Sequence, residues 1–233
     1  KIKELIKPGI LTDLTRLVLT NAIYFKGKWM SQFKKGMTRP ELFELMGGEK
    51  IEVPMMNQTR ELDYSEDETA QILEMPYEGN QLSMVIFLPK EKKGVKDLEN
   101  LLGAETFKNR VSALRKQDVI VSLPKFKMTS EFLLNEELKA LGMTDAFDTA
   151  LADFSGMTPD PVGLYILAVI HKAFVDVNEE GTEAAAATAV VMNLKGMMPE
   201  PKPVFRADHP FIFIIRDKSS DSILFIGRVM DPR

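Results

Sequence analysis

The chain has 233 residues, 45% of them hydrophobic and 8% aromatic, which predicts a globular protein with a substantial core. The net charge of −4, with both signs interspersed, argues against a nucleic-acid partner, and no apolar run is long enough to span a membrane. The absence of cysteine excludes disulfides, thiolate catalysis and cysteine-bound metals. The N-terminus shows neither an initiator methionine nor a signal peptide, so we expect the sequence to be part of a longer chain.

The first predicted elements are a short helix and a long strand. Apolar residues at helical spacing in residues 1–7, ended by Pro8, predict the last turns of an amphipathic helix. The β-branched and aromatic residues of 15–25 predict a strand. Asn21 is the one polar residue in an otherwise apolar face formed by Leu17, Leu19, Asn21, Ile23 and Phe25. A buried amide needs a hydrogen-bond partner. Trp29, the only tryptophan, follows the strand.

The middle of the chain alternates predicted strands with predicted helices. The turn sequence at 78–80 joins two strands into a hairpin, and the apolar run 83–88 is typical of a strand buried on both faces. Gly142 is expected to cap the last of the helices. The predicted strands are 50–56, 71–77, 82–89 and 118–127, and the predicted helices are 95–102, 104–114 and 133–141.

The last third adds a second long strand, 164–177, and two shorter ones, 211–215 and 223–229. We expect the face of the long strand that carries His171 to be the buried one. Long strands and scattered helices without regular βαβ alternation predict an α+β fold with mostly antiparallel sheets. A hydrogen bond between Asn21 and His171 would satisfy both buried groups. That pair is interpreted either as ordinary core satisfaction or as a polar lock in a sheet that must open.

No catalytic site is predicted. The two histidines, His171 and His209, belong to no HExxH-like pair, so a histidine metal site is not expected. The chain has no G-x-S-x-G elbow, no GxGxxG and no P-loop, so hydrolase, dehydrogenase and kinase chemistry have no support. We predict that the protein is not an enzyme and needs no cofactor or metal.

The segment 177–188 contains two acids, a glycine and a run of small residues. On propensity alone the alanines favour a short capped helix. The alternative is a loop that is also a latent strand, with side chains small enough to enter between two existing strands. The local sequence leaves both interpretations open.

Short motifs along the whole chain resemble, in the same order, those of the serpin family. The resemblance rests on several motifs rather than on one pattern. The motifs are 20–29, 53–56, 73–77, 87–89, 123–126, 152–156, 171–173, 179–188, 208–211 and 225–229.

This resemblance implies a partial serpin fold, with residues 1–233 forming the C-terminal portion of one serpin domain. The reactive-centre loop is then expected at about residues 178–203. Serpins are considerably longer at the N-terminus, so the preceding helices and first strands would be supplied by an N-terminal segment that completes the fold. Residues 15–25 and 164–177 resemble the two strands of the serpin A sheet between which the loop inserts.

The resemblance also implies the mechanism of a suicide substrate. A target serine protease attacks the loop, forms an acyl-enzyme and is trapped when the cut loop inserts as a new strand, a switch that serpins exemplify. Asn21, His171 and Trp29 would form the sheet-opening lock, with Trp29 where insertion begins. The expected hinge consists of Glu179, Glu180, Gly181, Thr182, Glu183, Ala184, Ala185, Ala186, Ala187 and Thr188.

The family's usual spacing from the hinge glycine places the reactive bond between Lys195 and Gly196. A lysine there suits a trypsin-like protease, although cleavage after Leu194 or Met192 is an alternative. Small hinge residues favour an inhibitor. The alternatives are a non-inhibitory carrier or chaperone, or a fragment that is inactive alone. The resemblance favours an extracellular location, and we expect no nucleic-acid or membrane partner.

Overall fold

The computed structural model describes residues 2, 5–13, 15–157, 163–181 and 201–233. These residues form two compact units, and each unit is built from two separate stretches of chain. Unit 1 contains Lys1–Phe25 and Met128–Val175, whereas unit 2 contains Lys26–Lys127 and Asp176–Arg233. The chain therefore passes from one unit to the other three times, and neither unit is a contiguous domain.

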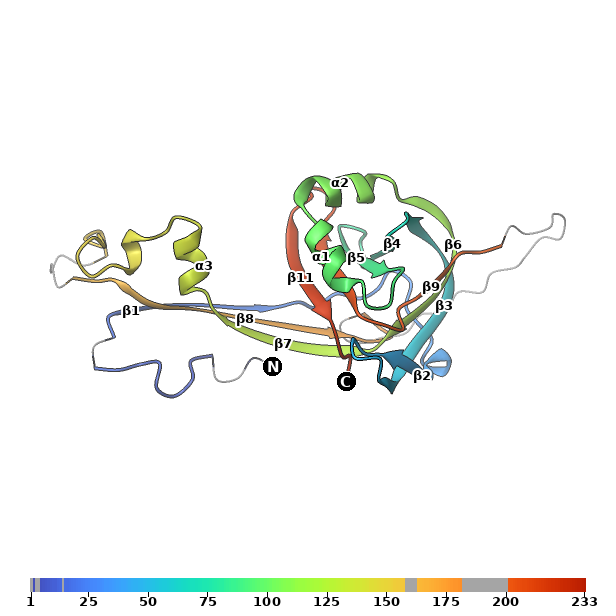
Figure 1. Ribbon diagram of the computed structural model, residues 1–233, viewed down its shortest axis with the longest axis horizontal. Helices are drawn as coiled ribbons and strands as arrows, with labels where there is room; N and C mark the ends of the chain where they lie inside the picture. The colour runs from blue at the N-terminus through green and yellow to red at the C-terminus, as the bar shows by residue number, and fades with distance from the viewer. Residues whose placement is uncertain (1, 3–4, 14, 158–162, 182–200) are drawn as a thin grey trace. The chain divides into compact units, whose positions relative to one another are not determined.

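Unit 1 is organised around a three-stranded sheet in the order β1-β8-β7 (Figure 1). Strands β1 (Leu17–Tyr24) and β8 (Ile166–Val177) run parallel, and β7 (Phe126–Leu133) lies on the other side of β8. The short helix α3 (Asn135–Ala140) and the 3₁₀ turn η2 (Asp145–Phe147) follow β7. The Asn135 side chain donates to Leu167 O at 2.7 Å and accepts from Val169 N at 2.9 Å, which ties the start of α3 to β8.

The burial of this sheet differs from the sequence prediction. Ile166, Ala168 and Ile170 are buried, whereas His171 on the opposite face is only partly buried and Asn21 is exposed. The same face leaves Leu19 41% exposed. Strand alternation shows which side chains share a face, but it cannot show whether a second layer covers that face. The prediction of a buried His171 face was therefore wrong for most of β8 in the structure described.

A second difference lies at the N-terminus. The described residues among the first seven, Ile2 and Leu5–Lys7, form a bend and no helix. Seven residues provide too few hydrogen bonds to offset the cost of helix nucleation, so such a segment depends on tertiary packing. The periodicity of residues 1–7 was therefore not sufficient to predict a helix.

Unit 2 contains an eight-stranded sheet in the order β11-β10-β5-β4-β3-β6-β9, with β2 paired to β3. Its neighbouring strands are antiparallel except for the parallel pair β6–β9. A 3₁₀ turn, η1 (Lys35–Met37), precedes β2. The strands are β2 (Arg39–Glu44), β3 (Lys50–Glu66), β4 (Ala70–Pro76), β5 (Leu82–Pro89), β6 (Arg115–Pro124), β9 (Val204–Arg206), β10 (Phe211–Asp217) and β11 (Ile223–Val229).

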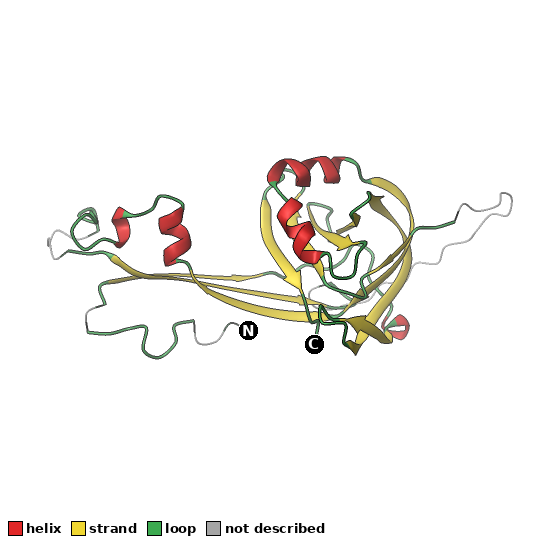
Figure 2. Ribbon diagram, viewed as in Figure 1, coloured by secondary structure: helices red, strands yellow, loops and turns green. Residues whose placement is uncertain are grey.

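The core of unit 2 lies between the central strands and two helices, α1 (Val95–Leu101) and α2 (Ala104–Ser112) (Figure 2). From β5 and β10, Phe87 and Ile214 pack with Leu98 of α1 and Phe107 of α2. Each such buried side chain contributes about 1.5–3 kcal/mol relative to exposure. The prediction that 83–88 is buried on both faces is confirmed.

The hairpin between β4 and β5 is also confirmed. Gly79 has φ of +84° and Asn80 has φ of +55°, which is the left-handed geometry that this glycine and asparagine tolerate. The predicted strand 118–127, in contrast, is two strands, because β6 ends at Pro124 and β7 begins at Phe126. Pro124 lacks a backbone N–H, so it is suited to the end of a ladder rather than its middle.

Candidate functional site: the base of the loop

A tight turn at Asn178–Gly181 forms the base of the loop segment. Asn178 N donates to Gly181 O and Gly181 N donates to Asn178 O, both at 3.1 Å. The Asn178 side chain accepts a hydrogen bond from Glu180 N at 3.0 Å. The chain therefore reverses direction within four residues of the end of β8. This reversal is where the sequence predicted the hinge to begin.

Gly181 occupies a position that only glycine fits. Its φ is +107°, and a Cβ atom there would lie 2.4 Å from Gly27 O and 2.5 Å from Trp29 N. The turn packs directly against the backbone of residues 27–29, with which Gly181 forms an isolated antiparallel bridge at Lys28. The positive φ and the close approach independently exclude a side chain.

Trp29 fastens the turn from the other side. The indole is buried and stacks on Tyr77, with ring centroids 4.5 Å apart and an interplanar angle of 11°. Its Nε1 donates to Asn178 O at 3.0 Å, and its backbone N donates to Glu180 O at 3.0 Å. Trp29 therefore holds both strands of the turn. The sequence predicted Trp29 at this point from the family resemblance, without its partners.

Glu179 is the buried acid of the turn. Its carboxylate lies 2.9 Å from Lys125 Nζ and accepts a hydrogen bond from Thr38 Oγ1 at 2.8 Å. Burial raises the pKa of Glu179, but hydrogen bonds from Lys125, its own backbone amide and Thr38 outweigh that effect and hold the pKa below its ordinary value. In addition, Phe33 N donates to Glu179 O at 2.9 Å.

A pocket of about 700 Å³ lies beside the turn within unit 2. Its charged lining is paired: Lys125 with Glu179, Lys35 with Glu180 at 2.7 Å, and Lys127 with Asp176 at 3.1 Å. The apolar part of the lining consists of Pro54, Phe126, Val177 and Pro232. The base of the loop is therefore held by ion pairs along one wall of this pocket.

In unit 1, Asn21 and His171 do meet. They are directly paired across β1 and β8, and Asn21 Oδ1 lies 3.0 Å from His171 Nδ1. The His171 ring also stacks on Phe132, with centroids 6.3 Å apart. The predicted hydrogen bond is therefore present, although it lies on an exposed face. Its role as a lock stays a prediction.

The remaining predicted site residues lie outside the described residues. These are the reactive bond, Lys195 and Gly196, and the hinge residues from Thr182 to Thr188. Within the part of the chain that the structure describes, no group of three or more His, Cys, Asp or Glu side chains could hold a metal ion. In that part, every helix is also too short or too polar to cross a membrane.

The comparisons with known proteins identify the family. A family model described as Serpin (serine protease inhibitor) matches residues 1–232. The chain belongs to the serpin family. An uncharacterized serpin-like protein of Thermococcus kodakarensis is 46% identical over 234 residues, and the leukocyte elastase inhibitor of Homo sapiens is 44% identical over 240 residues. Both alignments cover 100% of this chain.

This serpin chain spans 53% of the length of the first relative and 62% of the second. The crystal structure of uncleaved ovalbumin matches it with a TM-score of 0.86 at 31% identity, over 99% of this chain and 58% of that chain. The prediction of a partial serpin fold is therefore confirmed. The comparisons lend no support to the extracellular location expected from the sequence.

Sequence reasoning missed most of the partners at the base of the loop. Lys125, Thr38 and Tyr77 are separated from the turn by more than fifty residues in sequence. In the sequence Lys125 belongs to the motif 123–126 and shows no link to the turn, and Thr38 carries no signal of its own. Glu179 gave the one available clue, because an acid that begins a hinge and becomes buried needs a cation or several donors.

Proposed function

We propose that the protein containing this chain inhibits serine proteases as a suicide substrate. The loop at about 178–203 is the bait, and its cut N-terminal part inserts into the sheet between β1 and β8. In this proposal residues 1–233 are the C-terminal portion of one serpin domain. A preceding segment completes the fold, which accords with the exposure of Leu19 and Tyr24 on β1.

The observation that carries this proposal is the turn at Asn178–Gly181. Because β1 and β8 are parallel, a chain that reverses directly after β8 runs antiparallel to both strands. The sequence after Gly181 then supplies small residues, which enter a narrow gap without overpacking. Each inserted residue adds ladder hydrogen bonds worth about 0.5–1.5 kcal/mol net apiece.

The Asn21–His171 hydrogen bond supports the same proposal from unit 1. It crosses the seam between β1 and β8 that insertion would open. A hydrogen bond on an exposed face exchanges with water at low cost, whereas interdigitated apolar side chains do not. The pair would therefore keep the sheet closed without preventing it from opening.

The target is proposed to be a trypsin-like protease, because Lys195 stands at the expected reactive bond. The name of the human relative points to an elastase, and cleavage after Leu194 or Met192 is the matching alternative. Incubation of the full-length protein with trypsin and with elastase, followed by denaturing electrophoresis and mass spectrometry of the released peptide, separates these cases.

The expected result is an SDS-stable complex with trypsin and a released peptide that begins at Gly196. The variant Lys195→Glu should not form the complex with trypsin, because the specificity pocket of trypsin carries a carboxylate that repels a glutamate side chain. The non-inhibitory alternative, a carrier or chaperone, predicts cleaved protein without any SDS-stable complex. That outcome with both proteases would overturn the proposed inhibition by these two enzymes.

A further inference from the structure

The strand β9 is held weakly by its sheet. It has only three residues, lies at the end of the sheet order and, among the described strands, pairs only with β6, in parallel. Among the described residues it is the first element after the loop segment. Phe205 is buried, but Val204 is half exposed. Three residue pairs at a sheet edge give little stability, so further contacts must hold this strand.

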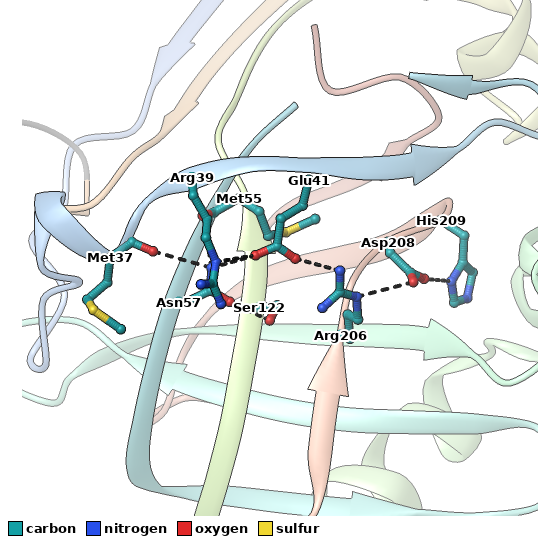
Figure 3. A network of polar contacts seen from close by, with 9 residues as sticks. All are labelled: Met37, Arg39, Glu41, Met55, Asn57, Ser122, Arg206, Asp208 and His209. Atoms are coloured by element: carbon teal, nitrogen blue, oxygen red, sulfur yellow. Dashed lines mark hydrogen bonds and ion pairs between the residues drawn. The ribbon is translucent and has the colours of Figure 1, made fainter. Parts of the chain in front are cut away.

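An alternating chain of charges supplies such contacts (Figure 3). Arg39 Nε lies 3.0 Å from Glu41 Oε1, and Arg206 Nη2 lies 2.5 Å from Glu41 Oε2. The Arg206 Nε atom then lies 3.4 Å from Asp208 Oδ2, and Asp208 Oδ1 lies 2.8 Å from His209 Nδ1. The Glu41–Arg206 contact is an ion pair rather than an aligned hydrogen bond. Cations and carboxylates thus alternate from β2 to the segment after β9.

Glu41 is the centre of this chain. Its side chain is only 10% exposed, and it accepts a hydrogen bond from Asn57 Nδ2 at 2.9 Å. Asn57 Oδ1 in turn accepts from Ser122 Oγ at 2.6 Å. Burial raises the pKa of Glu41, but the bonds from Asn57 and Arg39 and the charge of Arg206 outweigh it and lower the pKa. The carboxylate therefore links β2, β3, β6 and β9.

His209 ends the chain. The residue is 5% exposed, and its ring has Nδ1 2.8 Å from Asp208 Oδ1 and Nε2 2.7 Å from Pro89 O. Burial raises the pKa of the Asp208 carboxyl, but the hydrogen bond with His209 and the charges of Lys92 and Arg206 outweigh that effect and lower the pKa. His209 therefore ties the segment after β9 to the end of β5.

Other charged groups surround the same site. Glu44 N donates to Asp208 O at 2.8 Å, and the Glu44 carboxylate pairs with Lys92 at 2.9 Å. Lys50 acts on Glu44 through its charge, and Lys92 acts likewise on Asp208. Asp208 therefore has cationic neighbours besides His209. The contact of His209 Nε2 with Pro89 O ties this segment to the end of β5.

We propose that the chain Arg206–Glu41 and Asp208–His209 is a clamp that keeps β9 docked, with His209 fastening its far end to Pro89 at the end of β5. Arg206, Asp208 and His209 are positioning residues in this scheme. Their effect on inhibition rests on the proposed function, because β9 tethers the downstream end of the bait. The docking of β9 itself does not depend on that function.

The first test removes the histidine end of the clamp. In the full-length protein, His209→Ala should accelerate hydrogen exchange of the amides at 205–207 by about tenfold, because the contacts with Asp208 and Pro89 are lost. His171→Ala is the control, because His171 lies in unit 1 and contacts none of the clamp residues, so exchange at 205–207 should not change. Unchanged exchange in His209→Ala would overturn the clamp's histidine end.

The second test measures the docking of β9 by hydrogen exchange of the amides at 205–207. Arg206→Gln and Glu41→Gln should each accelerate exchange by about tenfold. Arg39→Gln is the matched control, because Arg39 pairs with the same carboxylate but lies on β2 beside it, so exchange should change less than about threefold. Equal acceleration by Arg39→Gln, or none by Arg206→Gln, would contradict the clamp.

A third comparison connects the clamp to inhibition. The variants Arg206→Gln and Glu41→Gln should lower the yield of the SDS-stable complex in parallel with their faster exchange at 205–207. Faster exchange with an unchanged yield would show that the docking of β9 does not affect inhibition. Loss of protease inhibition with unchanged exchange would instead count against β9 as the tether of the bait.

Discussion

Glu179 and Lys125 form an ion pair in which the carboxylate is 8% exposed and the ammonium 37% exposed, with 2.9 Å between Oε2 and Nζ. The buried Glu179 carboxylate therefore depends on the more exposed Lys125 ammonium to balance its charge. Glu179 begins the predicted hinge, and Lys125 lies at the junction between β6 and β7. The pair fixes the point from which the proposed bait leaves the fold.

Replacement of Glu179 should weaken the base of the loop. We predict that Glu179→Gln lowers the free energy of unfolding by about 1–3 kcal/mol, because the ion pair is lost while Thr38 keeps an acceptor. Glu179→Lys should cost more, because it places a second cation beside Lys125. Denaturant unfolding of the full-length protein measures both. Glu180→Gln is the control and should have a smaller effect, since its partner Lys35 is solvent-exposed; an equal effect would contradict the special role of Glu179.

Gly181→Ala should destabilise the turn through two separable effects, positive φ and steric overlap. Gly48 provides the matched control, because its φ is +87° but no atom lies within 4 Å of a Cβ there. Gly48→Ala should cost about 1 kcal/mol from backbone strain alone. Gly181→Ala should cost clearly more, because its Cβ meets backbone atoms that cannot rotate away. A similar loss of unfolding free energy in both variants would show that the backbone of residues 27–29 shifts at little cost to make room for the added methyl group.

Trp29→Phe separates the indole hydrogen bond from aromatic stacking. The ring still packs on Tyr77, but the donor to Asn178 O is removed, which leaves a partly buried carbonyl unpaired. The expected loss is about 1 kcal/mol in the free energy of unfolding. Hydrogen exchange of the Glu180 and Gly181 amides should accelerate in parallel. A stability loss without faster exchange at these amides would place the effect in the core rather than in the turn.

The Asn21–His171 pair should control the opening of the sheet more than global stability. Asn21→Ala, His171→Ala and the double variant should each accelerate amide exchange in β1 and β8, with less than additive effects in the double variant because the two residues share one bond. Because the pair is exposed, the unfolding free energy should change by less than about 1 kcal/mol. If the effects of the two single variants on amide exchange add strictly in the double variant, Asn21 and His171 do not act as a pair.

Acid should loosen unit 2. Glu41, Glu179 and Asp208 all have lowered pKa values in the fold. Each carboxylate therefore contributes stability above its unfolded pKa of about 4, and this contribution is lost as the pH falls through the lower folded value. The unfolding free energy should decrease below about pH 4, and less steeply in Glu179→Gln. An equal slope in both proteins would contradict the lowered pKa of Glu179.

Much of the fold was predictable from sequence because its signals are local. The hairpin 70–89 is defined by a turn sequence between apolar runs, and α1 and α2 by their periodicity. Strands β2 and β9 were not predicted. In β2, Pro40 and the charged residues interrupt the apolar pattern, and β9 has only three residues, too few to show a pattern. No local signal marks the division into units either, since each unit joins segments that are far apart in sequence.

The candidate site was only partly predictable for the same reason. Gly181 and Trp29 could be found through the family resemblance, and a glycine after two acids is a visible signal. The partners that fix Glu179 come from distant elements, and no pattern links Lys125 or Thr38 to the turn. The burial of Asn21 was mispredicted because alternation within a strand does not reveal what covers its face.

If the cut loop becomes a strand of the sheet, the unfolding temperature must differ before and after cleavage. Cleavage of the full-length protein within the bait should raise the unfolding temperature by about 10 °C or more, since several added ladder bonds each contribute about 0.5–1.5 kcal/mol. The hinge variant Ala184→Arg should be cut equally well but gain nothing. An unchanged or lower unfolding temperature after cleavage of the unmodified protein would contradict the account.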